Sequence, residues 1–483
     1  MKKAEMDRIE AKKMVNRRSF LKGMAGVAGF AALSAACAAP TPDVVEVEVE
    51  KEVEVTREVE VEVEKEVQVT VEVAPPSELI ELRFSSVGWG GWLSEPWMEI
   101  VDKFNASQSA IQIPGGYEDV AEGYQKVMAQ AAGAVAADVY MFETKRMQSF
   151  ASLGFFVALD DYVASSSVVQ EDKYFADDWS EMFWGGHQQL APFDNSPAMI
   201  WYNKDVFDEA GVDYPPTKYG EWDWADFLDT AQKLTQGEGA ERIYGWAGER
   251  GWYYSLPWIW SNGGWLLNEG KTECVIDMPE TIEALEWAAS LIHEHRVQPA
   301  ASELVQGGNS AMFYMGRAAM AQKGTWWAID LKAQEGLNWD VAPLPDGAAG
   351  AMTRNPLDAW GVWNGSRHPD AAWQFVEFLS SPDSLATLTL AGLSVSNKQV
   401  LSDVFATQEP ADVNWQIFFD ALDGHVRRHP DTAIYNEMND LLTPEWDAVL
   451  DGAKTPEEYA LAVKDPINAL LADCIAAGDC EGA

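Results

Sequence analysis

The chain has 483 residues, and its 77 acidic residues outnumber 34 basic ones to give a formal net charge of −43. A surface this acidic repels nucleic acid and anionic lipid, which excludes nucleic-acid binding, and the scarcity of arginine disfavours a phosphorylated ligand. The length is sufficient for a leader and two domains of ordinary size. The 22 tryptophans exceed ordinary usage. We expect about half of them in the core and the rest available to a flat amphipathic ligand.

Residues 1–36 have the pattern of an export signal and take no part in the fold. Their segment 16–22, Asn-Arg-Arg-Ser-Phe-Leu-Lys, resembles a twin-arginine signal, with Asn16 where Ser or Thr is usual. The apolar stretch that follows is too short for a stable transmembrane helix. It ends in Leu-Ser-Ala-Ala before Cys37, which is similar to a lipoprotein cleavage site although Leu33 lies one place further from the cysteine than usual. We therefore expect lipidation of Cys37 and anchoring at the outer face of the cell membrane; the alternative is plain secretion after an Ala-x-Ala cleavage.

Residues 37–77 would carry the anchor and a low-complexity stalk. From Val45 to Val73 every odd position is Val apart from three basic residues, and the even positions are mostly Glu. This period of two favours an extended chain over a helix, with Val on one side and Glu on the other. We expect a tether of about 100 Å if fully extended at ~3.3 Å per residue. The alternative is self-pairing into a β-ribbon through exposed valine edges.

Strand and helix patterns alternate after the stalk, which predicts an α/β sheet. Strands are expected at 80–84, 111–113 and 137–142, and helices at 97–104 and 124–132. Further along, helical spacing covers 224–234, 281–294 and 369–379, and the end of the chain is mainly helical.

One run in the middle of the chain has a distinctive order of elements. Residues 190–211, LAPFDNSPAMIWYNKDVFDEAG, contain a loop, a strand over 199–202 and a helix that ends at Gly211. Two prolines, a Trp and a second helix follow. This run resembles the extracellular solute-binding proteins of bacterial ABC importers, the sugar-binding family that includes maltose-binding protein. Later Gly-x-Ala-Ala-Met, Gly-x-Trp and Pro-Leu-Pro segments match the same family, so the resemblance covers residues 81–471.

The resemblance implies a two-lobe periplasmic-binding-protein fold of type II, an α/β architecture in which each lobe is a mixed sheet flanked by helices. Residues 78–195 and 357–398 would form lobe one, and residues 196–356 and 399–483 lobe two. It also implies a function: a monomeric extracytoplasmic component of an ABC importer that captures a carbohydrate between the lobes and delivers it to the permease subunits. No cofactor and no metal are expected.

Sugar recognition needs aromatic platforms and polar groups together, because the C–H face of a sugar stacks on a ring while its hydroxyls require donors and acceptors. Loops at strand ends that face an interlobe cleft supply both. By their place in the family pattern, the expected ligand contacts are Trp89, Trp92, Phe142, Glu143, Asp194, Asn195, Tyr253, Trp258, Asn262, Trp326, Asp358, Trp360 and Tyr435. For each of them the alternative is a role in the core or the hinge. Trp326 in Gly-x-Trp is the strongest candidate, and Trp327 is expected to point the other way.

Two other functions are compatible with an acidic two-lobe protein. A glycoside-acting enzyme needs only two carboxyl groups about 5–9.5 Å apart, but the chain contains no serine-nucleophile, metal-histidine or phosphate-loop motif, so we expect no catalysis. The same fold could instead bind a non-sugar ligand, cationic or peptide-like.

The four cysteines fit no zinc or haem spacing. Cys474 and Cys480 flank five residues that we expect to form a flexible loop closed by a disulfide, since the protein is expected outside the cytosol. Cys274 lies in an apolar segment and is expected to be a buried small residue.

Overall fold

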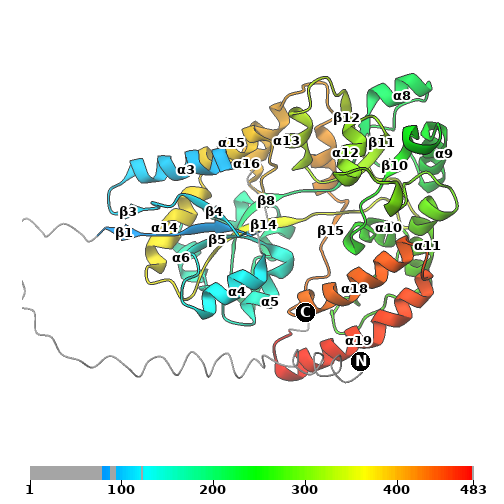
Figure 1. The fold of residues 1–483 in the computed structure, drawn as a ribbon. Coiled ribbons are helices and arrows are strands. Elements are labelled where there is room, and N and C mark those ends of the chain that lie inside the picture. Colours follow the sequence, from blue (N-terminus) through cyan, green and yellow to red (C-terminus); the bar gives the residue numbers. More distant parts are fainter. Residues whose placement is uncertain (1–78, 88–93, 121–122, 481–483) are drawn as a thin grey trace, which may run out of the picture. The chain divides into compact units, whose positions relative to one another are not determined.

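A computed structural model describes residues 79–87, 94–120 and 123–480. The export signal, Cys37, the Val/Glu stalk, Trp89 and Trp92 lie outside these residues. Within the described part of the chain, no helix has the length and apolar character needed to cross a membrane. A five-stranded sheet and a four-stranded sheet organise residues 81–108 and 113–480 (Figure 1).

The first sheet is mixed. Its strand order is β4 (Tyr117–Asp119), β2 (Phe84–Ser86), β5 (Val139–Glu143), β14 (Leu357–Val362) and β8 (Ala191–Asn195). β2 runs parallel to both of its neighbours, whereas β14 runs antiparallel to β5 and β8. The chain leaves this sheet at the end of β8 and returns at the start of β14, so the outgoing and returning segments lie side by side.

Aromatic residues cover both faces of the first sheet. On one face, Trp97 of α3 (Ser94–Ser107) and Phe375 of α14 (Pro369–Leu379) pack edge-on to Phe84, with ring centroids 5.9 and 5.2 Å away. On the other face, Phe142 packs 4.7 Å from Phe150 of α5 (Met147–Ala151), beside α4 (Tyr124–Ala132). Because successive strand residues face opposite sides, a sheet covered twice needs apolar residues along the middle of β5 and β14; the polar Glu143 and Asp358 lie near the strand ends.

The second sheet has the order β10 (Tyr244–Ala247), β11 (Ala318–Lys323), β9 (Met199–Asn203) and β12 (Trp339–Ala342). β9 is antiparallel to both neighbours, and β10 is parallel to β11. One face belongs to a core that includes residues of α9 (Trp224–Leu234) and α11 (Pro279–His293). On the other face, Trp201 packs against Trp327 of α13 (Trp327–Lys332) and Phe418 of α17 (Gln416–Leu422). The other α-helices before residue 435 are α6 (Asp160–Ser165), α7 (Ala176–Ser180), α8 (Lys204–Ala210), α10 (Leu256–Ser261), α12 (Gly308–Tyr314), α15 (Pro382–Ala391) and α16 (Lys398–Asp403).

Local signals account for most helix boundaries. Helices α4, α9 and α14 begin and end where the sequence predicts. Asn203 ends β9 and caps α8, because its side-chain oxygen accepts hydrogen bonds from the backbone N–H groups of Asp205 and Val206. The predicted first strand is wrong as one element. β1 (Ile80–Glu81) pairs with β3 (Ile111–Gln112) and β2 joins the first sheet, so the strand is divided between two pairings.

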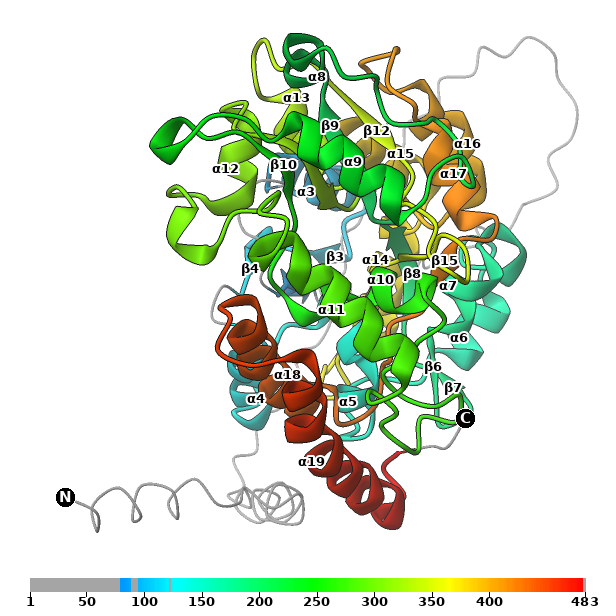
Figure 2. The same cartoon turned by 90° about the vertical axis from the view of Figure 1, so that its right-hand side faces the viewer.

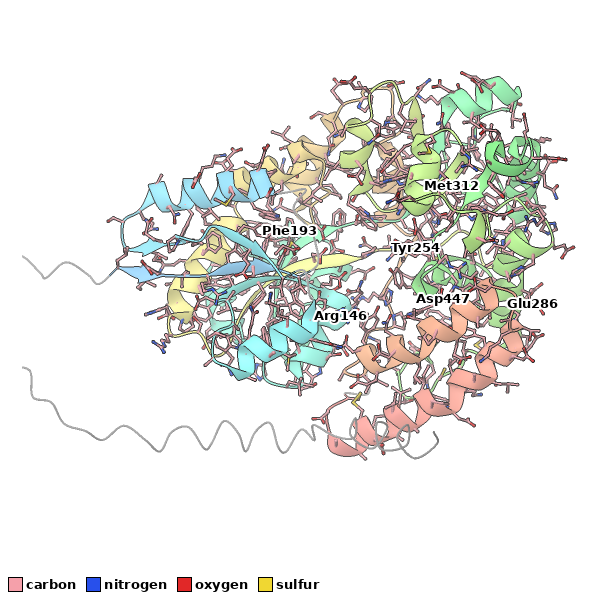
Figure 3. All side chains as sticks on the ribbon, viewed as in Figure 1. Arg146, Phe193, Tyr254, Glu286, Met312 and Asp447 are labelled. Carbon is pink, nitrogen blue, oxygen red and sulfur yellow. A yellow bond between two sulfur atoms is a disulfide. The ribbon has the colours of Figure 1, made fainter. Side chains whose placement is uncertain are left out.

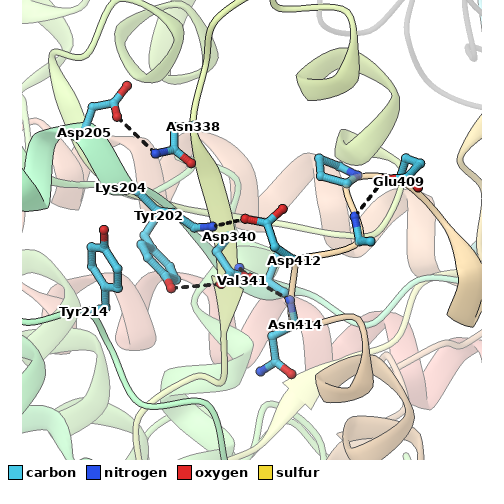
Figure 4. Close-up of polar contacts among 12 residues, drawn as sticks. Tyr202, Lys204, Asp205, Tyr214, Asn338, Asp340, Val341, Glu409, Asp412 and Asn414 are labelled. Atoms are coloured by element: carbon cyan, nitrogen blue, oxygen red, sulfur yellow. Dashed lines mark hydrogen bonds and ion pairs between the residues drawn. The ribbon is translucent and has the colours of Figure 1, made fainter.

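A polar network fastens the segment before α17 to the second sheet (Figure 4). The Asp340 carboxylate of β12 accepts hydrogen bonds from the Tyr202 hydroxyl at 3.1 Å and from the Asn414 backbone N–H at 2.7 Å. The ammonium of Lys204 lies 2.9 Å from the carboxylate of Asp412. These contacts connect a late part of the chain to strands that lie about 70 and 200 residues earlier in sequence.

Two long helices, α18 (Tyr435–Leu450) and α19 (Pro456–Ala477), end the chain and pack beside α11 (Figure 2). A disulfide joins Cys474 to Cys480. The flexible loop predicted between them is wrong: the helix continues to Ala477 and stops at Gly478, which adopts a left-handed conformation with φ 73°. Cys274 is fully buried, as predicted.

More of the tryptophans are buried in the core than the sequence analysis predicts. Most of those that the structure describes are buried, and they lie on both sheets and on the helices that cover them. A sheet packed on two faces creates two cores per lobe, and large rings fill this volume. The expectation that half of the tryptophans would remain available to a ligand is therefore wrong for the described residues.

Candidate ligand-binding site

A cleft of about 490 Å³ is lined by residues from the elements of both sheets. This volume is typical of small-molecule sites. The first sheet and α4 contribute Val87, Gly123, Tyr124, Glu143, Lys145, Asp194 and Asp358, and the remainder of the wall is Ser196, Tyr253, Tyr254, Trp326, Asp330, Arg354 and Pro356. Four of these side chains are aromatic and six are ionisable carboxyl or basic groups, which is the combination that sugar recognition requires.

The Trp326 ring lies directly over the backbone of Gly324. A Cβ atom built on this glycine would fall 1.9 Å from ring atom Cζ3 of Trp326, so no larger residue fits beneath the ring. The turn between them is held by the backbone N–H of Thr325, which donates to the Ser196 hydroxyl at 3.0 Å. The Gly-x-Trp segment thus fixes a flat aromatic face that remains partly exposed in the cleft.

Arg354 is enclosed by three aromatic rings of the cleft. Its guanidinium carbon lies 4.3 Å from the ring centroid of Tyr254, which Figure 3 labels, and 5.0 and 5.8 Å from those of Tyr253 and Trp326. The side chain is 3% exposed and makes no ion pair with any residue that the structure describes. Cation–π attraction therefore stabilises both the buried charge and the positions of the rings.

Two aspartates meet where the chain leaves and re-enters the first sheet. Asp194 of β8 lies opposite Asp358 of β14, and the backbone N–H of Asp358 donates to Asp194 Oδ1 at 2.8 Å. Burial, followed by the charge of Asp358, raises the pKa of Asp194 well above its ordinary value. Two buried carboxyl groups in contact share a proton, so the pair offers a donor and an acceptor to a ligand hydroxyl.

Glu143, at the end of β5, carries a second polar cluster. Its carboxylate lies 2.7 Å from Lys145 Nζ and 3.4 Å from Arg146 Nε, and it accepts a hydrogen bond from the Tyr124 hydroxyl at 3.1 Å. Burial raises the pKa of Glu143, but the two cations outweigh it and bring the pKa below its ordinary value. The carboxylate is thus ionised and held in place. Arg146, which Figure 3 labels, also donates a hydrogen bond to the side chain of Asn436 at the start of α18.

Five of the expected ligand contacts line this cleft: Glu143, Asp194, Tyr253, Trp326 and Asp358. Trp327 points away as predicted. It is 1% exposed, and its indole N–H donates to the Tyr314 hydroxyl at 2.6 Å.

Three other candidates are interior residues of the first sheet or of the crossing, not cleft residues. Trp360 is fully buried and stacks on Phe193 at 4.3 Å, because its strand position faces α3. Phe142 is buried on the opposite face. Asn195 is also fully buried, and its amide donates to Asp178 at 2.9 Å. Asn195 and Trp360 lie on the strands at which the chain leaves and re-enters the first sheet, and Phe142 lies on β5, but the alternation of side chains along a strand turns them inward.

Three further candidates, Trp258, Asn262 and Tyr435, also lie outside the cleft wall. Trp258 lies in helix α10 and packs 5.5 Å from Phe227 in the core. The Asn262 amide donates to the Glu280 carbonyl and the Glu283 carboxylate. Tyr435 is 1% exposed beneath Arg146. None of the three lines the cleft among its described wall residues.

Sequence reasoning missed several wall residues, chiefly Tyr124, Lys145, Ser196, Tyr254 and Arg354. Tyr254 follows Tyr253 in residues 251–264, the most aromatic stretch of the chain, and Lys145 is two residues from Glu143. Both could have been found by extending those candidates along the chain. Arg354 carries one signal, an arginine in an arginine-poor acidic chain just before the return strand.

A family model described as bacterial extracellular solute-binding protein matches residues 90–386. The chain belongs to this family. Among curated proteins it is similar to a putative binding protein of Brucella abortus, 23% identical over 364 residues that cover 74% of this chain and 82% of that protein. It is also similar to an uncharacterized lipoprotein encoded in the oleD 5′ region of Streptomyces antibioticus, 26% identical over 401 residues, with 79% and 85% covered.

Solved structures show the same fold. An ABC substrate-binding protein of Listeria monocytogenes in complex with cycloalternan superposes with a TM-score of 0.74 at 24% identity, covering 82% of this chain and all of that one. A solute-binding protein of Thermotoga lettingae bound with α-D-tagatose gives a TM-score of 0.71 at 21% identity, over 81% of this chain and all of that one. The solute-binding protein thus has the predicted two-lobe, type II α/β fold.

Proposed function

We propose that this solute-binding protein is the extracytoplasmic component of an ABC importer and that it captures a carbohydrate in the cleft. The Trp326 face, fixed over Gly324, supports this best, because it supplies a platform for the C–H side of a sugar. The Asp194–Asp358 pair and the Glu143 carboxylate would bind hydroxyls at the rim. The partner that receives the sugar would be the membrane permease.

The similarity to solved structures that contain bound sugars supports the same proposal. The Listeria monocytogenes and Thermotoga lettingae structures hold cycloalternan and tagatose, and a Thermotoga maritima neighbour holds maltose. The similarity to the lipoprotein of Streptomyces antibioticus supports a lipid anchor at Cys37.

The capture mechanism that we propose is closure of two lobes. Lobe one would comprise residues 78–195 and 357–398, and lobe two residues 196–356 and 399–483. The short connection between β8 and β9 and the segment before β14 would act as hinges. A sugar can favour the closed form only through contacts that form there, so wall residues from both lobes should contribute to its affinity.

Arg354 favours a second candidate ligand, a sugar that carries an acidic group. It is a buried cation at the cleft wall, and Lys145 lies in the same wall. A relative that covers only 42% of this chain, at 24% identity, is a sn-glycerol-3-phosphate-binding protein of Escherichia coli. Competition between neutral and acidic sugars of the same size distinguishes the two candidates.

Adjacent tryptophans provide the test. A thermal-shift screen of neutral, acidic and basic ligands first identifies a ligand, because one that binds only the native state raises the melting temperature. Trp326→Ala should then weaken its binding by roughly ten- to a hundredfold, from about 1–3 kcal/mol of lost stacking, with little change in the melting temperature of the free protein. Trp327→Ala is the matched control and should lower that temperature, because a buried Trp is worth about 3–5 kcal/mol of stability. Unchanged affinity with a lowered melting temperature in Trp326→Ala would show that Trp326 is a core residue.

A further inference from the structure

A second cavity of about 750 Å³ shares no lining residue with the cleft. Its walls come from residues 260–278 and 426–430, with Asp177 of α7 at the margin. The strand β15 (Val426–Arg427), which pairs with β13 (Thr353–Arg354), forms one side. The volume again falls in the range of small-molecule sites, and the proposed sugar capture does not use it.

The opposite side is an ordered hairpin. The backbone N–H of Val275 donates to the Leu266 carbonyl at 2.9 Å, and that of Asn268 donates to the Glu273 carbonyl at 2.9 Å. At its base, the backbone N–H of Trp265 donates to the Thr281 hydroxyl at 3.0 Å. This wall is therefore pre-formed, which lowers the entropy that a ligand would have to offset on binding.

The cavity wall is apolar on one side. Trp260, Leu266, Val275 and Met278 contribute side chains, and Trp265 stands at the rim with 39% of its surface exposed. Trp265 thus adds an accessible aromatic surface to this apolar part of the wall.

The cavity wall also carries the basic residues Lys271, Arg427 and Arg428 beside the acids Asp177 and Glu269, in a protein of net charge −43. The guanidinium carbon of Arg427 lies 4.6 Å from the Trp265 ring centroid, and its buried Nε has no hydrogen-bond partner. Arg428 pairs with Glu181 at 3.5 Å and Asp177 at 3.8 Å. In the ranges that the structure covers, neither Arg427 nor Lys271 makes an ion pair. Two cations therefore remain available to a ligand.

His429 also lines the cavity. Only 7% of it is exposed, and its Nδ1 lies 3.4 Å from the Asp431 carboxylate. Its Nε2 makes neither a hydrogen bond nor an ion pair with any residue that the structure describes. A buried polar group without a partner costs about 1–3 kcal/mol. A ligand oxygen could satisfy Nε2.

We propose that this cavity is a second binding site, for a small carboxylate with an apolar body. The body would lie against Trp265 and Met278, and the carboxylate would bind Arg427 and Lys271. A single negative charge fits better than a phosphate dianion, because the acidic protein around the site repels each added charge. The cavity and its basic wall carry the proposal independently of the sugar assignment.

Calorimetric titration of the full mature chain with phenylacetate tests this site, with the neutral phenylacetamide as the charge control. We expect phenylacetate to bind and phenylacetamide to bind roughly tenfold more weakly or not at all. Arg427→Gln and, as a second variant if that protein does not fold, Lys271→Gln should each weaken phenylacetate roughly tenfold. Arg367→Gln removes an exposed arginine outside both cavities and should leave binding unchanged.

The variants also separate this site from the sugar cleft. Trp326→Ala should keep phenylacetate binding, and Trp265→Ala should lose it while keeping the affinity for the cleft ligand. Equal binding of the acid and the amide, no binding of either, or loss of phenylacetate binding in Trp326→Ala but not in Arg427→Gln would overturn the proposal. None of these results depends on which sugar, if any, the cleft accepts.

Discussion

Trp326 keeps its ring at the cleft wall because Gly324 leaves the space beneath it empty. The glycine has an ordinary backbone conformation here, and it is required only for the close approach of the ring. The guanidinium of Arg354 lies over the same ring at 5.8 Å from its centroid and also contacts the rings of Tyr253 and Tyr254. The platform is thus positioned by its neighbours, and an additional methyl group should displace it.

Gly324→Ala is the corresponding prediction. The methyl group would occupy the place of the ring, so we expect the ligand affinity to fall about as far as in Trp326→Ala, by roughly ten- to a hundredfold, although the tryptophan remains. Gly115→Ala is the matched control, because a Cβ there meets nothing within 4 Å. Calorimetry measures both. An affinity for Gly324→Ala within twofold of the wild type would show that the ring position does not matter for binding.

Asp178 shows how a single side chain ties three elements together. It lies on α7, and its carboxyl oxygens accept hydrogen bonds from the amides of Asn195 at 2.9 Å and Asn355 at 3.2 Å. Asn195 ends β8 and Asn355 precedes β14, so both crossings between the sheets are held at one point. Burial raises the pKa of Asp178 to about 7.

This shift predicts a pH dependence of stability. The folded protein holds a proton on Asp178 that the unfolded chain releases above about pH 4. The stability from this group is therefore fully present below pH 4 and is lost as the pH rises through 7. The free energy of unfolding, measured with denaturant between pH 4 and pH 8, should fall as the pH rises. The fall should be smaller in Asp178→Asn, by about 1.4 kcal/mol for each pKa unit by which Asp178 is shifted.

The exposed Asp102 offers a control for that experiment, since Asp102→Asn should keep the wild-type slope. Glu181 and Asp431 also have raised pKa values, mainly through burial, so part of the decline should persist in Asp178→Asn. An identical pH profile for wild type and Asp178→Asn would contradict the assignment of this proton to Asp178.

At the level of the whole molecule, membrane anchoring through Cys37 and ligand binding in the cleft should be independent of each other. Cys37→Ser should release the mature protein from membranes, because one lipid-bearing residue is expected to hold it there. Fractionation of cells with an antibody to the protein measures this. Wild-type protein found wholly in the soluble fraction would count against the lipoprotein assignment.

The Val/Glu stalk is expected to be dispensable for ligand binding. Deletion of residues 43–73 should leave the affinity for the cleft ligand within experimental error, since every wall residue of the cleft lies after the stalk. Calorimetry on the shortened protein measures it, and deletion of the hairpin residues 266–275 serves as a contrast that should disturb folding. A loss of folding on removal of the stalk would show that these residues belong to the folded part.

Much of this protein follows from short-range signals. Helices α4, α9 and α14 have the predicted bounds because capping residues, prolines and apolar spacing act within a few residues. Residues 190–211 identified the family and the Gly-x-Trp segment identified the best platform residue, because these patterns too extend over only a few residues. Asp194 and Asp358 were expected at the crossings, but their direct contact depends on the register between β8 and β14.

Long-range packing determined the rest. Trp360 and Trp326 are both tryptophans near crossings, yet Trp360 stacks on Phe193 in the core and only Trp326 reaches the cleft. Arg354 has only a weak signal in the sequence, and it became a wall residue because Tyr253 and Tyr254, a hundred residues earlier, enclose it. Which face of a strand is covered, and by what, depends on contacts between distant segments, and these contacts leave no periodic signal in the sequence.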